Sequence, residues 1–266
     1  MIIIGELINS SRKKIRTAME NQDAGFIKKI ATQQEEAGVD YIDVNAGVFG
    51  EEELDKLQWT IEQVQAVCKT PLSIDSPRPD AIKLGLELHA NGKPLINSIS
   101  KETNRWNEMF TQALESEAVV LGLCIDDNGI PDQPETRLKI ADQIINDFVR
   151  AGKKIEDIAI DPITTPIGVN TKFGLTTLDT IEKIRGKFPE VNIITGLSNI
   201  SFGLPARKQL NRAFVVMCMA FGLNGALVNP LDPVMMSIIK AADSLLDHDP
   251  YCAEYLKAYR NGRVTN

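Results

Sequence analysis

Polar side chains end almost every short apolar run of this sequence, and most of them are carboxylates or amides. They are Glu6 and Asn9 (GELIN), Asp43 and Asn45 (IDVNAG), Asp75 (LSIDS), Asn97 (LINSIS), Asp161 (AIDP), Ser198 and Asn199 (GLSNIS), and Asn229 (LVNP). A carboxylate only accepts hydrogen bonds, whereas an amide both donates and accepts them. Together these groups can match the edge of a flat polar heterocycle on which donors and acceptors alternate.

Asp and Asn also cap helices and form turns after strands, and for any one of these residues that role explains its position equally well. It does not explain why Asp75 and Asp161 occur among a majority of amides. A pterin fits this set, because its aminopyrimidinone edge presents adjacent N–H donors that one carboxylate accepts in a bidentate manner. Each buried polar atom left unmatched costs about 1–3 kcal/mol, so such a site is selective.

The elements that must position these residues alternate along the whole chain. Short β-branched runs predict strands at Ile2–Ile8, Tyr41–Asn45, Pro71–Ser76, Leu95–Ser98, Val119–Cys124, Asp157–Asp161, Asn192–Gly196 and Ala226–Asn229. Helical periodicity predicts helices at Ala24–Ala37, Glu51–Cys68, Pro79–His89, Asn104–Glu115, Glu135–Ala151, Thr176–Phe188, Ala206–Phe221 and Pro233–Leu246, with a short final helix at Pro250–Tyr259. Eight such units predict an α/β fold, a single (β/α)8 TIM barrel whose active site lies at the carboxyl ends of the strands.

Length and composition support one domain over residues 1–266, because a (β/α)8 barrel takes about 250 residues and 43% of this chain is hydrophobic. The net charge of −7 argues against a nucleic-acid partner. The N-terminal segment lacks the features of a signal peptide and no run is long enough to span a membrane, so we expect a cytoplasmic protein. Four scattered cysteines and two histidines predict no metal site.

The stretch Ala213–Leu223 is apolar all round, although an outer barrel helix needs only one apolar stripe. A second surface is therefore expected to cover it. Neighbouring helices with the C-terminal segment, or a second copy of the chain, would both serve, and we expect a homodimer.

At these motifs the chain resembles the pterin-binding methyltransferase family, in particular the methyltetrahydrofolate:corrinoid protein methyltransferases of acetogens and the folate components of corrinoid-dependent demethylase systems. The resemblance covers nearly the whole length. It is carried by GELIN at 5–9, DVNAG at 43–47, SIDS at 73–76, INS at 96–98, TRL at 136–138, IDP at 160–162, GLSN at 196–199 and NRAF at 211–214.

The resemblance implies a role for each matched residue. Asp75, Asn97 and Asp161 would hold the pterin ring, with Asp161 on the N3 and 2-amino edge, and Gly196 and Ser198 would line the same rim. Asn199 would approach N5, the atom that bears or receives the methyl group, and is the expected catalytic residue. Arg207 is assigned to the aminobenzoate side, and Glu6, Asn9, Asp43, Asn45 and Asn229 remain candidate rim contacts.

The resemblance implies methyl transfer between N5 of tetrahydrofolate and a corrinoid. Tetrahydrofolate and methyltetrahydrofolate would then be substrates. The DxHxxG motif of base-off corrinoid modules is matched neither by LHANG at 88–92 nor by DHDPY at 247–251, so a separate corrinoid protein is the expected partner. The direction from methyl-corrinoid to tetrahydrofolate is slightly favoured. Dihydropteroate synthase shares SIDS and IDP, but this chain has LSN and VNP where that family has S-R-K and R-x-H motifs. A non-catalytic folate-binding barrel is the remaining alternative.

Overall fold

The computed structural model describes residues 1–264, which form a closed barrel of eight parallel strands. The strands are β1 Ile2–Asn9, β2 Tyr41–Asn45, β3 Leu72–Asp75, β4 Leu95–Lys101, β5 Val119–Asp126, β6 Ile158–Asp161, β7 Asn192–Gly196 and β8 Gly225–Val228. Each strand pairs with its neighbours in chain order, and β1 closes the barrel on β8. The predicted (β/α)8 architecture is confirmed.

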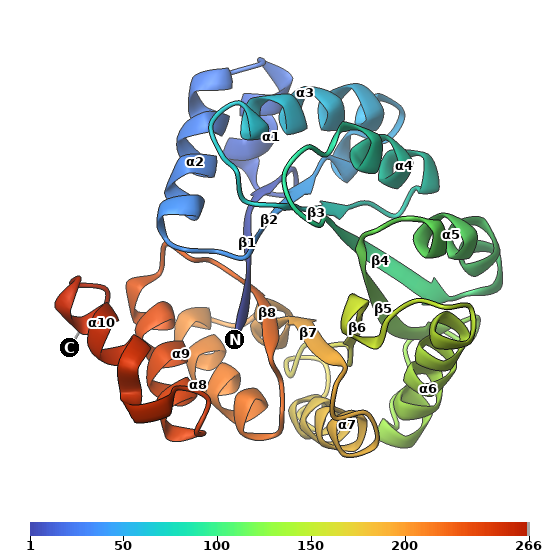
Figure 1. Cartoon of the computed structure of the whole chain (residues 1–266), viewed down its shortest axis with the longest axis vertical. Helices are drawn as coiled ribbons and strands as arrows, with labels where there is room; N and C mark the ends of the chain where they lie inside the picture. Colours follow the sequence, from blue (N-terminus) through green and yellow to red (C-terminus); the bar gives the residue numbers. More distant parts are fainter. Residues whose placement is uncertain (265–266) are drawn as a thin grey trace.

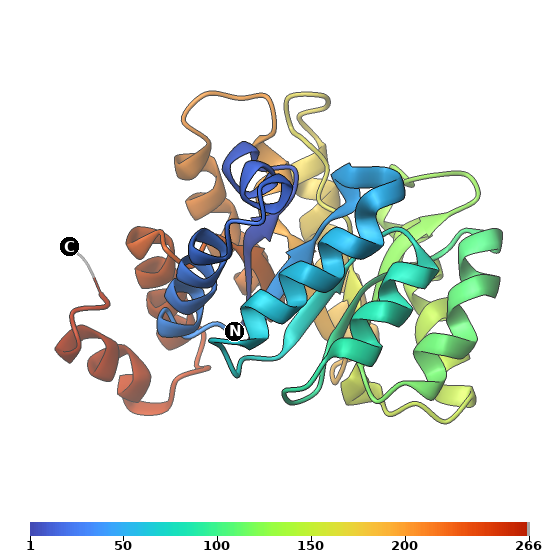
Figure 2. The same cartoon turned by 90° about the horizontal axis from the view of Figure 1, so that it is seen from above.

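Helices surround the strands on the outside of the barrel (Figure 1). They are α1 Lys13–Glu20, α2 Ala24–Glu36, α3 Glu53–Gln65, α4 Pro79–Leu88, α5 Thr103–Glu115, α6 Pro134–Arg150, α7 Phe173–Lys187, α8 Arg207–Ala220, α9 Pro233–Leu245 and α10 Ala253–Arg260. The last helix, α10, projects beyond the ring beside α9 (Figure 2). None of the helices in residues 1–264 is long and apolar enough to cross a membrane.

Short helices account for the main differences from the elements that the sequence predicts. The helix α1 was not expected, because only Ile15, Ala18 and Met19 of its eight residues are buried. The 3-10 helices η1 Gly47–Glu52, η2 Ile155–Asp157 and η3 Leu197–Ser201 were also not expected, and the predicted final helix is divided into a 3-10 turn, η4 Pro250–Cys252, and α10. Two of them, η1 and η3, directly follow β2 and β7, so they shape the loops at the carboxyl ends of these strands.

Every second residue of each strand points into the barrel, and this alternation places the candidate site residues there. Toward the amino ends of the strands, the barrel interior is filled by an apolar cluster of Ile4, Leu95, Val119, Leu121, Ala159 and Ile194. Two residues further along their strands, Glu6, Asn97 and Asp161 share the inward face with Ile4, Leu95 and Ala159. The apolar cluster therefore lies one layer closer to the amino ends of the strands than these polar residues do.

The strand β1 is irregular next to Glu6. The pairing of β1 with β2 shifts register between Gly5 and Ile8. The buried Gln34 of α2 lies against this irregularity, where its Oε1 accepts a hydrogen bond from Leu7 N at 3.1 Å. A side chain on Gly5 would collide with the Gln34 carboxamide, so glycine is required for this close approach.

Replacing Gln34 tests this arrangement. We expect Gln34→Ala to lower the free energy of unfolding by about 1–3 kcal/mol, because Leu7 N–H loses its buried acceptor. Chemical denaturation measures the difference, with Gln33→Ala at the adjacent, less buried position of α2 as the control. Equal stabilities of the two variants would contradict the assignment.

Candidate functional site

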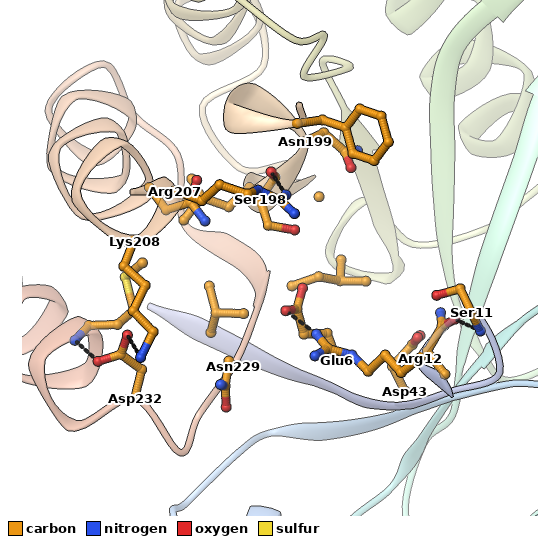
Figure 3. A pocket seen from close by; sticks show the side chains of 18 residues that line it. Glu6, Ser11, Arg12, Asp43, Ser198, Asn199, Arg207, Lys208, Asn229 and Asp232 are labelled. Atoms are coloured by element: carbon orange, nitrogen blue, oxygen red, sulfur yellow. Dashed lines mark hydrogen bonds and ion pairs between the residues drawn. The ribbon is translucent and has the colours of Figure 1, made fainter. Parts of the chain in front are cut away.

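A pocket of about 740 Å³ opens at the carboxyl ends of the strands. Its lining comes mainly from the ends of β1, β7 and β8 and from the segments that follow them. The lining residues that Figure 3 labels are Glu6, Ser11, Arg12, Asp43, Ser198, Asn199, Arg207, Lys208, Asn229 and Asp232. Figure 3 shows Ser198, Asn199 and Arg207 on one side, facing Glu6, Arg12 and Asp43 across the pocket.

Asp43 is the most deeply buried carboxyl of this pocket, with 1% of its surface exposed. Its Oδ1 accepts hydrogen bonds from Ser73 Oγ at 2.6 Å and from Asn97 Nδ2 at 3.1 Å. Burial raises the pKa of Asp43 well above its usual range, and the charge of Asp75 raises it further. Burial of this kind disfavours the charged form of the carboxyl.

Asp75 and Asn97 are neighbours in the barrel wall, because their strands β3 and β4 pair in register at these two residues. Burial raises the pKa of Asp75 to about 6, although a hydrogen bond from Asn45 and the positive charge of Arg105 lower it. Asp75, Asn97 and Asp43 therefore form one connected polar group beside the pocket.

Asp161 ends β6 on the other side of the barrel. Its Oδ1 accepts hydrogen bonds from Ile163 N at 2.7 Å and from Thr195 Oγ1 at 2.8 Å. Burial raises the pKa of Asp161 to about 6, and hydrogen bonds from Ile163 N, Thr195 and Gly196 N oppose this rise. The carboxyl is thus fixed in one orientation by neutral donors.

The 3-10 helix η3 presents Ser198 and Asn199 at the pocket edge. Arg207 at the start of α8 anchors η3, since its Nη2 donates to Ser198 O at 2.7 Å and its Nε donates to Ser201 Oγ at 3.0 Å. The exposed side-chain amide of Asn199 makes no hydrogen bond to any described residue. It does not cap η3, and Asn199 lines the pocket.

The remaining predicted rim residues divide into one pocket carboxyl and three turn formers. Glu6 pairs with Arg12 at 2.6 Å, and burial raises the pKa of Glu6 while Arg12 lowers it. The side chains of Asn9, Asn45 and Asn229 accept hydrogen bonds from the backbone N–H two residues further on, at Ser11, Gly47 and Leu231. For these three amides the turn-forming role is observed, and Asn9 and Asn229 also line the pocket.

Several pocket residues lie outside the predicted set. Arg12, Phe202, Lys208 and Asn211 line the pocket from loops and from the first turn of α8. Their positions carry no periodic signal, because loop and helix-end residues reach the pocket only through the barrel geometry. Asn211 belongs to the NRAF stretch, and its buried Oδ1 has no hydrogen-bond partner among residues 1–264.

The lining of the pocket includes Asp43 but not Asp75, Asn97 or Asp161, which lie on β3, β4 and β6 of the barrel wall. Within the described part of the chain, no group of three or more His, Cys, Asp or Glu side chains could hold a metal ion. Residues 5–229 match the family model described as pterin binding enzyme. The chain belongs to this pterin-binding family. The matched residues span all eight strands and include every candidate site residue.

Two kinds of relative share substantial sequence with this pterin-binding barrel. It is 38% identical to the methylcorrinoid:tetrahydrofolate methyltransferase of Eubacterium limosum, with coverage of 99% of this chain and 98% of the relative. It is 30% identical to the methionine synthase of Mycobacterium leprae over 86% of this chain. The matched region is only 20% of that much longer protein.

Solved structures with a similar fold include dihydropteroate synthases. The enzyme from Vibrio fischeri superposes with a TM-score of 0.70 at 18% identity, covering 92% of this chain and 93% of that one. The enzyme from Xanthomonas albilineans gives a TM-score of 0.68 at 16% identity, with 93% and 92% coverage. At these identities the likeness describes the barrel fold.

The raised pKa of Asp75 predicts a measurable pH dependence of stability. The folded state binds this proton more tightly than the unfolded state, so stability falls as pH rises from the usual value of 3.8 to about 6. We expect Asp75→Asn to abolish this loss. Between pH 4 and pH 7, the free energy of unfolding of the variant should rise relative to the wild type by up to about 3 kcal/mol.

Denaturant titrations at pH 4 and pH 7 measure this difference. Asp127→Asn is the control, because hydrogen bonds from Thr103 lower the pKa of the exposed Asp127. That variant should show no gain over the same pH range. Parallel pH profiles for Asp75→Asn and the wild type would contradict the buried, proton-binding state of Asp75.

Proposed function

We propose that this pterin-binding barrel is a methyltransferase that moves a methyl group between a corrinoid protein and N5 of tetrahydrofolate. The observation that carries the proposal is the side-chain amide of Asn199. It lines a pocket together with the buried acid Asp43 and has no hydrogen-bond partner among the described residues. The full-length similarity to a methylcorrinoid:tetrahydrofolate methyltransferase supports the same reaction. Tetrahydrofolate and methyltetrahydrofolate are substrates in this scheme.

In the proposed complex, Asp161, Asp75 and Asn97 hold the pterin ring. Asp161 accepts hydrogen bonds from the N3 and 2-amino edge, and its bonds to Ile163 and Thr195 keep it aligned for that contact. Gly196 and Ser198 form the adjacent rim, since both line the pocket. Binding of this edge requires Asp161 in its ionised form, and a pKa of about 6 provides that form at neutral pH.

At N5 the protein must stabilise a changing charge. A tertiary amine is a poor leaving group, so its bond to methyl breaks only when N5 is hydrogen bonded or protonated. Asn199 supplies the hydrogen bond, and the proton comes from water or through a hydrogen-bonded network. In the opposite direction, Asn199 orients the N5 lone pair toward the incoming methyl group.

The corrinoid is proposed to belong to a separate protein that docks at the mouth of the pocket in the cytoplasm. When docked, the corrinoid provides or takes up the methyl group. The chain lacks the DxHxxG motif that a base-off corrinoid module carries. The proposed direction is from methyl-corrinoid to tetrahydrofolate, as in the demethylation of a methylated growth substrate.

Asn199→Ala tests the catalytic role directly. We expect methyl transfer to slow by at least about a hundredfold, equivalent to roughly 3 kcal/mol, because an interaction that strengthens in the transition state is lost. Folate binding should weaken proportionately less. Thermal stability should stay near that of the wild type, since the amide holds no other part of the chain.

Single-turnover transfer from methylcobalamin or a methyl-corrinoid protein to tetrahydrofolate provides the rate, and thermal melts provide the stability. Asn192→Ala is the control, because its amide bonds to Glu156 O and to Asn224 at the start of β7, away from the pocket. An unchanged transfer rate in Asn199→Ala contradicts the assignment. A wild-type protein that joins pterin diphosphate to aminobenzoate would instead be a synthase, and one that binds folate without turnover would be a binding barrel.

The outward face of α8 supports the proposed homodimer. Val216, Met217 and Phe221 remain 37%, 46% and 36% exposed in the chain alone, so neither α7 nor α9 covers this apolar surface. The stretch Ala213–Leu223 was expected to need a covering surface, and a second copy would supply it. Symmetric pairing through one surface patch is the commonest way in which soluble chains associate.

Met217→Glu tests this interface. We expect the variant to sediment as a monomer at concentrations where the wild type is a dimer, because a buried, unpaired charge opposes association. Val67→Glu is the control, since Val67 is similarly exposed but follows α3 on the opposite side of the barrel (Figure 1). A monomeric wild type, or a dimer that survives Met217→Glu, would contradict the proposal.

A further inference from the structure

Arg137 is a buried arginine that the proposed reaction leaves unused. It lies in the first turns of α6, in the TRL stretch, and none of its surface is exposed. Arginine is almost never fully buried unless it is paired. Arg137 forms no ion pair with any described residue, and its Nη2 has no hydrogen-bond partner there. A charge so costly to bury calls for a function beyond packing.

The partners of Arg137 are backbone carbonyl groups. Its Nε donates to Pro131 O at 2.7 Å, and its Nη1 donates to Pro162 O at 2.9 Å and to Ile163 O at 2.6 Å. Pro162 and Ile163 are the two residues that follow Asp161. One guanidinium thus joins the loop before α6 to the loop that leaves β6.

The loop after Asp161 has a backbone conformation that needs support. Ile163 has a φ of 62°, which is unfavourable for a β-branched residue and costs about 1–3 kcal/mol. This conformation directs Ile163 N–H at Asp161 Oδ1. Thr177 Oγ1 also donates to Ile163 O, at 3.3 Å. Arg137 and Thr177 together hold the peptide that orients the Asp161 carboxyl.

We propose that Arg137 is a positioning residue for Asp161, acting through the carbonyl groups of Pro162 and Ile163 and through its positive charge. The first route fixes the direction of the carboxyl, and the second favours its ionised form. This inference rests on the proposed function, because it assigns Asp161 to the pterin edge.

The surroundings of Asp161 make the charge of Arg137 influential. Cys124 on β5 and Arg137 on α6 are the titratable groups that interact with Asp161. The adjoining side chains of β7 and α7, Thr195 and Thr177, are uncharged. Burial raises the pKa of Asp161, and Arg137 opposes that rise. Removing the guanidinium should therefore move the pKa of Asp161 further upward.

Two substitutions separate the routes. Arg137→Met keeps much of the volume but removes the charge and the donors, whereas Arg137→Lys keeps the charge but not the planar fork. We expect Arg137→Met to weaken binding of 6-methyltetrahydropterin at pH 7 at least about tenfold. The pH at which binding is half lost should rise by about one unit. Arg137→Lys should weaken binding while leaving that pH near the wild-type value.

Arg185→Met is the matched control. Arg185 also donates only to backbone carbonyls, at Gly222, Pro189 and Val191, but it lies at the opposite end of the barrel. We expect this variant to lose thermal stability yet keep the wild-type affinity and pH profile. Calorimetry across pH 5–8 measures binding, and carbon NMR titration of the aspartate carboxyls measures the ionisation of Asp161 without ligand.

The two readouts distinguish this inference from the proposed function. Failure of the wild type to bind any reduced pterin would overturn the proposed function, and the NMR titration would still report on Arg137. An unchanged Asp161 titration in folded Arg137→Met, together with wild-type pterin affinity in folded Arg137→Lys, would overturn the positioning role. If Arg137→Met does not fold, an unchanged affinity and NMR titration in Arg137→Lys overturn it alone.

Discussion

The closed barrel forces every second side chain of each strand into one confined interior, and the site depends on this constraint. Toward the amino ends of the strands, apolar residues such as Ile4, Leu95 and Ile194 fill this interior and exclude water. Polar side chains next to this apolar cluster lose their hydration, so their hydrogen-bond partners must come from neighbouring strands. Register supplies these partners, because β3 and β4 bring Asp75 beside Asn97. The same geometry that builds the core therefore builds the candidate site.

The site carboxyls are held mostly by neutral donors. Asp43 is bonded to Ser73 and Asn97, and Asp161 to Thr195 and a backbone N–H. Strong ion pairs would hold such groups ionised and satisfy them completely. Burial raises the pKa of Asp161 and of Asp75 to about 6, and the hydrogen bonds that they accept only partly oppose this rise, so each carboxyl can accept a ligand donor or exchange a proton near neutral pH.

Two loops at the rim are shaped by arginines that bind backbone carbonyls. Arg207 holds η3 from outside, and Arg137 holds the loop after β6 from within the core. In both cases the arginine fixes the backbone next to a candidate site residue, Asn199 for Arg207 and Asp161 for Arg137. Rigid support of this kind is what allows a short polar side chain to act on one atom of a bound ring. Its cost is the burial of charge at Arg137.

The sequence by itself determined the fold class, the eight strands and the presence of acids and amides at their ends. These features are local, because a period of two residues and a helical period are written in each segment. It also predicted Asp75, Asn97, Asp161 and Asn199 through motifs that the family model matches. Tertiary structure decided which of these side chains bond to one another. No local pattern places Asp43 against Asn97, 54 positions away. Nor does one show that an arginine of α6 binds the loop after Asp161, because that contact joins residues 26 positions apart. The turns at Asn9 and Asn45 are local, since each side chain accepts from the N–H two residues further on.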